Sequence, residues 1–207
     1  MKKRLMIIGV ILLIFSIIFT VALTKVDVSP IGPQKSTVGF STLNQKLTPE
    51  YNEKYYKVSK YLGYLALLIP VVYACIGLVQ LVKGKSLSKV DKRLIILAVF
   101  YVIVLATYVF FEKVIINYRP VILDEGLEAS YPSSHTLMSI FFTISAVIIN
   151  KEMFKGKYAS INILLFLLGG SIIAFRAVSG VHWFTDIVGS LLIGLTLLTF
   201  FKASIKE

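Results

Sequence analysis

Residues 94–111 read LIILAVFYVIVLATYVFF, a run without a charged residue that lies between Arg93 and Glu112. A helix needs roughly 20 predominantly apolar residues to cross a bilayer, and five other blocks of the chain resemble this one. The predicted spans are residues 5–24, 61–82, 94–111, 134–150, 161–175 and 183–201. The sequence therefore predicts an all-α protein, an integral membrane bundle of six transmembrane helices.

The composition of the 207-residue chain excludes a soluble globular protein. Hydrophobic residues make up 57% of the chain and charged residues only 16%, whereas a soluble domain is close to half apolar and about a quarter charged. Apolar and polar residues do not alternate as they do in the strands of a membrane β-barrel. The single cysteine, Cys75, lies within an apolar block, so a disulfide scaffold is excluded as well.

The six blocks take up more than half of the chain and leave no room for a separate soluble domain. We expect residues 1–57 to form the first transmembrane helix and an extracytoplasmic loop, and residues 58–207 to complete a single helical bundle. Pro70 lies inside the second span, where neighbouring helices can accommodate a kink. The polar stretch 25–60 is interpreted as a connector that ends in an amphipathic helix, and the alternative is a cap over a site that faces lipid.

The distribution of the net charge of +11 predicts the orientation in the membrane. If the N-terminus is cytoplasmic, the cytoplasmic segments hold thirteen of the 22 basic residues but only three of the 11 acidic residues. Short cytoplasmic loops carry an excess of Lys and Arg, so both termini are predicted to be cytoplasmic. Because topology explains the positive charge, we reject nucleic acid as a partner.

The first apolar block, which follows Met-Lys-Lys-Arg, could also be a cleavable signal peptide. Its apolar run is longer than the usual 7–15 residues of a signal peptide, and it has no clear Ala-x-Ala cleavage site. We therefore expect a retained first helix.

Three segments predicted to lie on the extracytoplasmic side share unusual chemistry. They are residues 112–120 (EKVIINYRP), 131–135 (YPSSH) and 176–186 (RAVSGVHWFTD). Together they contain both histidines of the chain and two of its four arginines. Because ionisable residues at the level of the membrane are energetically unfavourable, these segments indicate a functional site.

The segment 132–135 predicts the start of a helix, because proline is tolerated in the first turn and serine can cap a helix. Free backbone N–H groups and the helix dipole make such a start a site for an anion, to which Ser133 and Ser134 add hydroxyl donors. Taken alone, this signal is weak, because helices often begin with Pro-Ser, and the alternative is an ordinary helix cap.

His182 and Asp186 lie four residues apart and share one face if the sixth helix begins near His182. The carboxylate can then accept the Nδ1 proton and leave Nε2 free as a nucleophile or base. The alternative is a hydrogen-bonded pair without a chemical role. Arg119 and Arg176 carry planar guanidinium groups that suit phosphate geometry, and their presence favours an anion-binding site.

The three segments resemble the signature of the type 2 phosphatidic acid phosphatase (PAP2) superfamily, which reads Lys-x6-Arg-Pro, Pro-Ser-Gly-His and Ser-Arg-x5-His-x3-Asp. Residues 119–120 match the end of the first motif, residues 132–135 the second, and Arg176, His182 and Asp186 the third with its spacing intact. The order of the motifs and the six-span layout also match, so the resemblance covers about residues 58–205.

Three positions depart from this signature. Ser134 replaces the motif glycine, which keeps a backbone N–H but restricts positive φ. Phe175 replaces the serine before Arg176 and removes one phosphate contact. Lys113 is one residue too close to Arg119, and on a helix a step of six turns it about 100° further from that face than a step of seven.

The resemblance implies a metal-independent phosphatase without a cofactor. In this interpretation His182 attacks phosphorus and forms a phosphohistidine, Asp186 holds its tautomer, and His135 protonates the leaving oxygen and then activates water. The residues implied to bind the phosphoryl oxygens are Lys113, Arg119, Ser133, Ser134 and Arg176. No acidic cluster in the sequence suggests a set of Mg²⁺ ligands.

The implied substrate is a lipid phosphate or pyrophosphate at the extracytoplasmic face of the cell membrane. Undecaprenyl pyrophosphate, phosphatidylglycerophosphate and phosphatidate are the candidates, and the sequence does not separate them. An alternative class is a binding or transport protein that kept the anion pocket and lost turnover. A bis-histidine haem protein is a third class, which the arginines and the His182–Asp186 pair disfavour.

Overall fold

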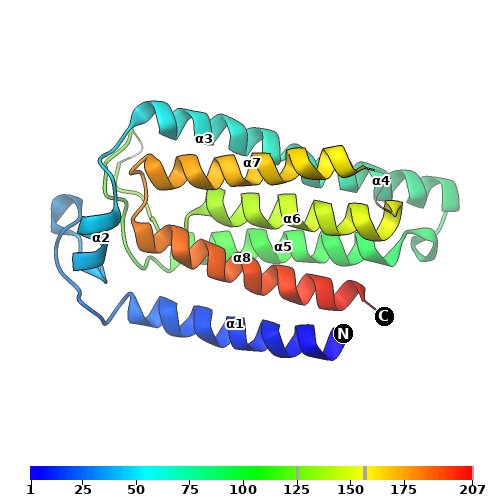
Figure 1. The fold of residues 1–207 in the computed structure, drawn as a ribbon, viewed down its shortest axis with the longest axis horizontal. Coiled ribbons are helices and arrows are strands. Elements are labelled where there is room, and N and C mark those ends of the chain that lie inside the picture. The colour runs from blue at the N-terminus through cyan, green and yellow to red at the C-terminus, as the bar shows by residue number, and fades with distance from the viewer. Residues whose placement is uncertain (125, 156–157, 207) are drawn as a thin grey trace.

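The computed structural model describes residues 1–124, 126–155 and 158–206, and its regular elements are helices (Figure 1). Six helical segments in this part of the chain are long and apolar enough to cross a membrane, which confirms the predicted all-α bundle. The helices are α1 (Lys2–Ala22), α2 (Ser41–Leu47), α3 (Glu53–Ala66), α4 (Leu68–Gly84), α5 (Lys92–Lys113), α6 (Ser134–Phe154), α7 (Ala159–Val178) and α8 (Phe184–Ile205), with short 3₁₀ turns at Pro33–Lys35 and Leu87–Lys89.

The second span is built from two helices, α3 and α4, which are separated at Leu67. Pro70 has no N–H, and its ring conflicts with the carbonyl four residues earlier, that of Ala66, so the helix breaks one turn before the proline. The predicted kink is therefore confirmed. This span also begins earlier than predicted, at Glu53, because the side chain of Asn52 accepts a hydrogen bond of 3.2 Å from the Tyr55 amide and caps α3.

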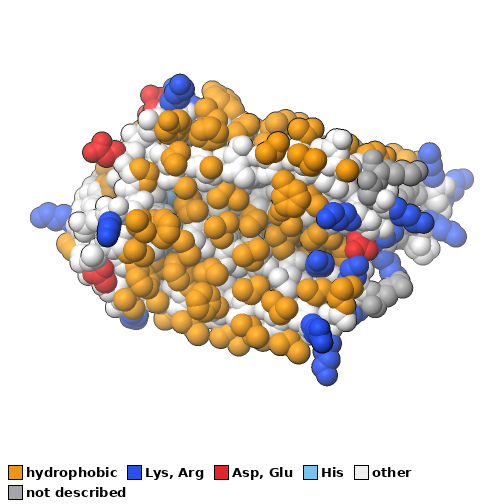
Figure 2. Space-filling model, viewed as in Figure 1, with side chains coloured by type: hydrophobic (Ala, Val, Ile, Leu, Met, Phe, Trp, Pro, Cys, Tyr) orange, Lys and Arg blue, Asp and Glu red, His pale blue; other side chains and the backbone are white. Residues whose placement is uncertain are grey.

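Helix α6 lies at the centre of the bundle and packs against α5, α7 and α8. Its apolar contacts include the rings of Phe100, Phe141 and Phe201, which are mutually in contact and of which the latter two are fully buried. The outward faces of the bundle are apolar as well, and Figure 2 shows such side chains along most of the length of one face. This is the pattern expected of helices that face lipid.

Both termini lie at one end of the bundle, and the connections α1–α2–α3, α5–α6 and α7–α8 lie at the other end (Figure 1). In this view Lys and Arg side chains gather at the end that holds the termini (Figure 2). The three polar segments all lie at the opposite end, in the connections and the helix turns next to them, and we call this the loop end.

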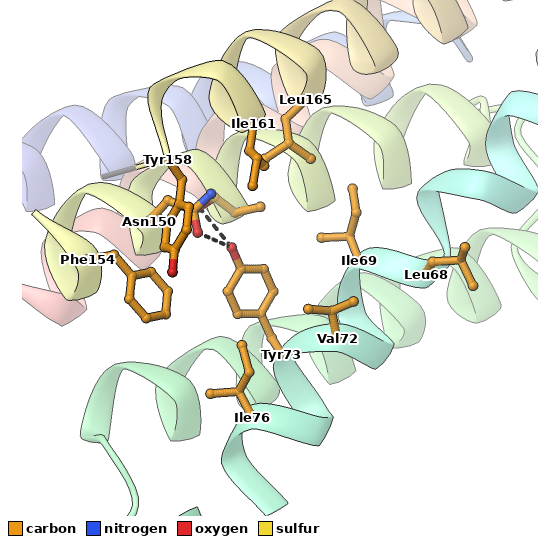
Figure 3. A pocket seen from close by; sticks show the side chains of 11 residues that line it. Leu68, Ile69, Val72, Tyr73, Ile76, Asn150, Phe154, Tyr158, Ile161 and Leu165 are labelled. Carbon is orange, nitrogen blue, oxygen red and sulfur yellow. Dashed lines mark hydrogen bonds between the residues drawn. The ribbon is translucent and has the colours of Figure 1, made fainter. Parts of the chain in front are cut away.

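A pocket of about 320 Å³ lies between α4, α6 and α7 in the half of the bundle near the termini (Figure 3). Most of its lining is apolar, but the Tyr73 hydroxyl points toward Asn150 and donates a hydrogen bond of 2.7 Å to Asn150 Oδ1. Asn150 Nδ2 in turn donates to Asn162 Oδ1 at 2.9 Å. These buried polar groups are thus paired with one another and connect the three helices.

Candidate active site

Two short extended segments of the α5–α6 connection, residues 117–119 and 128–130, pair in antiparallel fashion. Tyr118 and Ala129 form the bridge, the Arg119 amide donates to the Glu128 carbonyl, and the Ser130 amide donates to the Asn117 carbonyl. Side chains alternate along extended chain, so this pairing directs Asn117, Arg119, Glu128 and Ser130 to one face. The sequence shows no alternation over such short segments, and the pairing was not predicted.

His182 does not belong to α8 but precedes it, so the expectation that His182 and Asp186 share a helix face is wrong. The helix begins at Phe184 because Asp186 caps it, accepting the Trp183 amide at 2.9 Å. His182 Nδ1 lies 3.7 Å from Asp186 Oδ2, which is beyond hydrogen-bond distance.

Ser130 lies between the two side chains. Its Oγ is 3.1 Å from His182 Nδ1 and donates to Asp186 Oδ2 at 2.5 Å, while Asn117 Nδ2 donates to Asp186 Oδ1 at 3.0 Å. All four side chains are buried. Sequence reasoning missed Ser130 and Asn117, and the only available signal was that each lies two residues before a motif proline or arginine.

The start of α6 agrees with the prediction, with Ser133 as the N-cap residue. The Ser133 hydroxyl makes no capping bond and is buried without a partner. The Ser133 carbonyl is held by the Ser190 hydroxyl at 3.0 Å, which fixes this turn against α8. Partly buried His135 follows in the first turn, and its ring packs so closely on Gly63 of α3 that a Cβ there would lie 2.6 Å from His135 Cδ2.

Arg176 lies in the last turn of α7 with only 1% of its surface exposed. Its guanidinium stacks 5.0 Å above the ring centre of Tyr56, and its Nε and Nη1 atoms have no hydrogen-bond partner. Arg119 forms an ion pair of 2.7 Å with Glu128, and its Nε is also buried without a partner. Tyr56 was not predicted as a neighbour of the site, because its position depends on tertiary packing.

The stretch between α1 and α3 connects them and also contacts the start of α8. Asn44 accepts a hydrogen bond of 3.1 Å from the Thr185 amide, and Thr48 accepts one of 3.1 Å from the Phe184 amide. These contacts satisfy free amides at the start of α8. The stretch therefore caps the helix that begins next to His182.

Several of the buried polar atoms without a partner at the loop end suit a phosphoryl group. They include His182 Nε2, Arg119 Nε, Arg176 Nε, Arg176 Nη1 and Ser133 Oγ. Burial, together with the Arg119 and Arg176 charges, lowers the pKa of His182 well below its ordinary value, so its imidazole is neutral at neutral pH. A neutral imidazole beside two cations and a free hydroxyl suits attack on a phosphoryl group.

Comparison with known proteins identifies the family of the chain. The model of the PAP2 superfamily matches residues 5–207. The chain belongs to the PAP2 superfamily. One similar solved structure is the crystal structure of the first transmembrane PAP2 type phosphatidylglycerolphosphate phosphatase from Bacillus subtilis, with a TM-score of 0.57 and 18% identity over 95% of this chain and 94% of that chain. No curated protein gives a significant sequence match.

The protein is thus a multi-pass membrane phosphatase of the PAP2 type, a metal-independent phosphomonoesterase family. Within the described residues, no group of three or more His, Cys, Asp or Glu is placed to hold a metal ion.

The structure shows the surroundings of Phe175 and Lys113, two of the three positions that depart from the PAP2 signature. Phe175 packs on the Tyr55 ring, with 5.8 Å between ring centres, and so contributes to the contact of α3 with α7. Lys113 is the last residue of α5; it is exposed, and in the described part of the chain it makes no hydrogen bond or ion pair with the residues of the site. Its role in binding phosphate stays a prediction.

Proposed function

We propose that the protein hydrolyses lipid phosphates on the extracytoplasmic face of the cell membrane through a phosphohistidine at His182. The observation that carries this proposal is the set of buried polar atoms without partners around His182, Arg176 and Ser133. An unpaired buried donor is unfavourable unless a ligand completes it. A phosphoryl group supplies acceptor oxygens for these donors and an electrophile for Nε2.

In the first step His182 Nε2 attacks the terminal phosphorus, and the bond from that phosphorus to the oxygen of the leaving group breaks, the leaving group being the lipid alcohol of a monophosphate or the lipid monophosphate of a pyrophosphate. His135 in its protonated form donates its proton to that oxygen. In the second step His135 takes a proton from water, whose oxygen attacks the phosphohistidine and releases inorganic phosphate. The groups proposed to hold the phosphoryl oxygens in both steps are Arg119, Arg176, Ser133, Ser134 and Lys113.

A cavity beside His135 supports a lipid as the leaving group. It has a volume of about 270 Å³ and lies between α3, α5 and α6. Ser134 and His135 form part of its wall, and the rest is mainly apolar, including Leu67, Met138 and Phe142. An alkyl chain in this cavity would leave its phosphate next to His135.

The excess of basic residues at the end that holds the termini supports a cytoplasmic location for that end and an extracytoplasmic location for the site. The proposed substrates are undecaprenyl pyrophosphate, phosphatidylglycerophosphate and phosphatidate. The similar Bacillus subtilis protein is a phosphatidylglycerolphosphate phosphatase, which adds support for the second of them.

The test is phosphate release by the purified protein in detergent with EDTA, using these three lipids. We expect release by the wild type, and a loss of at least about 10⁴-fold in His182→Ala. Lys113→Ala run in parallel measures whether that side chain contributes, as a rise in KM. Absence of release from every lipid, with retained lipid-phosphate binding, would favour a binding or transport protein instead.

A further inference from the structure

The direct contact between His182 and Asp186 that the sequence predicts is replaced by a chain of three groups. The His182 Nδ1 to Asp186 Oδ2 distance is 3.7 Å, and the Ser130 hydroxyl lies within 3.1 Å of the imidazole and 2.5 Å of the carboxylate. The carboxylate accepts two further hydrogen bonds, from the Trp183 amide and from the Asn117 side chain. Asp186 therefore acts on His182 through Ser130.

The direction of the two hydrogen bonds follows from the chemistry of the groups. An ionised carboxylate only accepts, so the Ser130 O–H must donate to Asp186 Oδ2. Having used its one proton, Ser130 Oγ can only accept from His182 Nδ1, which must then carry the imidazole proton. This leaves Nε2 with a lone pair, and Nε2 is the ring nitrogen that is buried without a partner.

We propose that Ser130 is a positioning residue that fixes the reactive tautomer of His182. The backbone of Ser130 is itself fixed, because its amide donates at 3.0 Å to the Asn117 carbonyl in the antiparallel pairing. Ser130 is also buried, with 2% of its surface exposed. The inference rests on the proposed nucleophilic role of His182, but the tautomer can be measured independently of activity.

The chain has only two histidines, which makes this measurement simple. In protein labelled with ¹⁵N at histidine, NMR in detergent distinguishes a protonated from an unprotonated ring nitrogen, and His182→Ala assigns the two imidazoles. We expect Nδ1–H with a bare Nε2 at His182 in the wild type. In Ser130→Ala we expect the proton to move, at least in part, to Nε2.

The kinetic counterpart compares Ser130→Ala with Ser145→Ala, which removes an equally buried hydroxyl from the middle of α6. Loss of an outer hydrogen-bond partner that orients a catalytic side chain reduces activity by 10–100-fold. We expect a fall of about that size in kcat for Ser130→Ala, with KM changed less than about twofold because the phosphate ligands are intact. Ser145→Ala should match the wild type, and Ser130→Thr should restore the Nδ1–H tautomer.

Retention of the Nδ1–H tautomer in Ser130→Ala would overturn the proposal, whether or not kcat falls. An equal fall of kcat in Ser145→Ala would overturn it too, because the effect would then not be specific to the site. If the tautomer moves as expected but His182→Ala keeps its activity, the proposed function fails and the assignment of Ser130 stands.

Discussion

Two of the buried polar clusters in this bundle differ in how their hydrogen bonds are completed. In the pocket near the termini, Tyr73, Asn150 and Asn162 bind one another across three helices (Figure 3). At the loop end, Arg176 and Ser133 are equally buried but have polar atoms without any partner. The first cluster resembles the polar contacts that hold membrane helices together. The second contains the groups that we propose to bind the phosphoryl group.

The comparison separates stability from function in one small protein. Removing a member of the paired cluster leaves a buried group unsatisfied and should weaken the fold, with little effect on turnover. Removing a member of the unpaired cluster should weaken turnover, with little effect on the fold. The following predictions test this division, from the largest expected effect to the smallest.

The strongest test is Arg176→Met, which keeps an unbranched apolar side chain and removes the charged guanidinium. We expect kcat/KM to fall by about 10²–10³-fold, the effect typical of losing a donor to the transition state. The thermal unfolding temperature should stay the same or rise, because burial of the unpaired charge no longer opposes folding. Phosphate release and thermal unfolding in the same detergent measure both, and a marked loss of stability would contradict the division.

Gly63→Ala tests the close approach of α3 to the His135 ring. The added Cβ would lie 2.6 Å from His135 Cδ2, so the ring must move, and a displacement of about 1 Å reduces activity by roughly 10–100-fold. Gly170→Ala is the matched control, because nothing lies within 4 Å of a Cβ there. Equal activities of the two variants would show that the position of His135 is not critical.

The pH profile tests the electrostatic effect of Arg119 on His182. Attack requires the neutral imidazole, and burial together with the Arg119 and Arg176 charges holds the pKa of His182 below its ordinary value of 6.5. Activity should therefore persist below pH 6.5 and fall only as the pH passes through the lowered pKa. In Arg119→Gln we expect the pKa of His182 to rise and the acid limb of kcat/KM to move to higher pH.

An NMR titration of the His182 imidazole measures the same shift directly, with Arg4→Gln as a control at the other end of the bundle. An unchanged pKa of His182 in Arg119→Gln would mean that Arg119 does not contribute and that burial and the Arg176 charge set its value.

Tyr73→Phe should have the smallest effect, and only on stability. The change leaves Asn150 Oδ1 without the donor at 2.7 Å, and hydrogen bonds between membrane helices contribute about 0.6 kcal/mol on average and up to about 1.7. We expect a slightly lower unfolding temperature in detergent and an unchanged kcat/KM. A loss of activity comparable to that of Arg176→Met would show that the Tyr73 cluster is also needed for turnover.

Much of the fold follows from the sequence, because an apolar block that crosses lipid must satisfy its own backbone hydrogen bonds and therefore forms a helix. The Pro70 kink and the start of α6 at Ser134 were also predictable, since both depend on local backbone chemistry. The ends of the helices were harder to predict, because interfacial residues such as Glu53 continue a helix beyond its apolar run.

The sequence predicted the chemically distinctive residues of the candidate site but not the common polar residues beside them. His182 and Arg176 are rare residue types in an apolar chain and therefore stand out. Ser130 and Asn117 are common polar residues whose importance arises only from the antiparallel pairing of their segments. The position of His182 before α8 was also not predictable from spacing, because the cap formed by Asp186 decides where the helix begins.

The most direct test of the central claim is to trap the covalent intermediate. The protein is mixed with a lipid phosphate labelled with ³²P, quenched in alkali, in which phosphohistidine is stable, and mapped by peptide sequencing. Since the chain has only two histidines, the label has two possible histidine positions. The account predicts label at His182 and none in His182→Ala. Label at His135, or turnover without any labelled histidine, would contradict it.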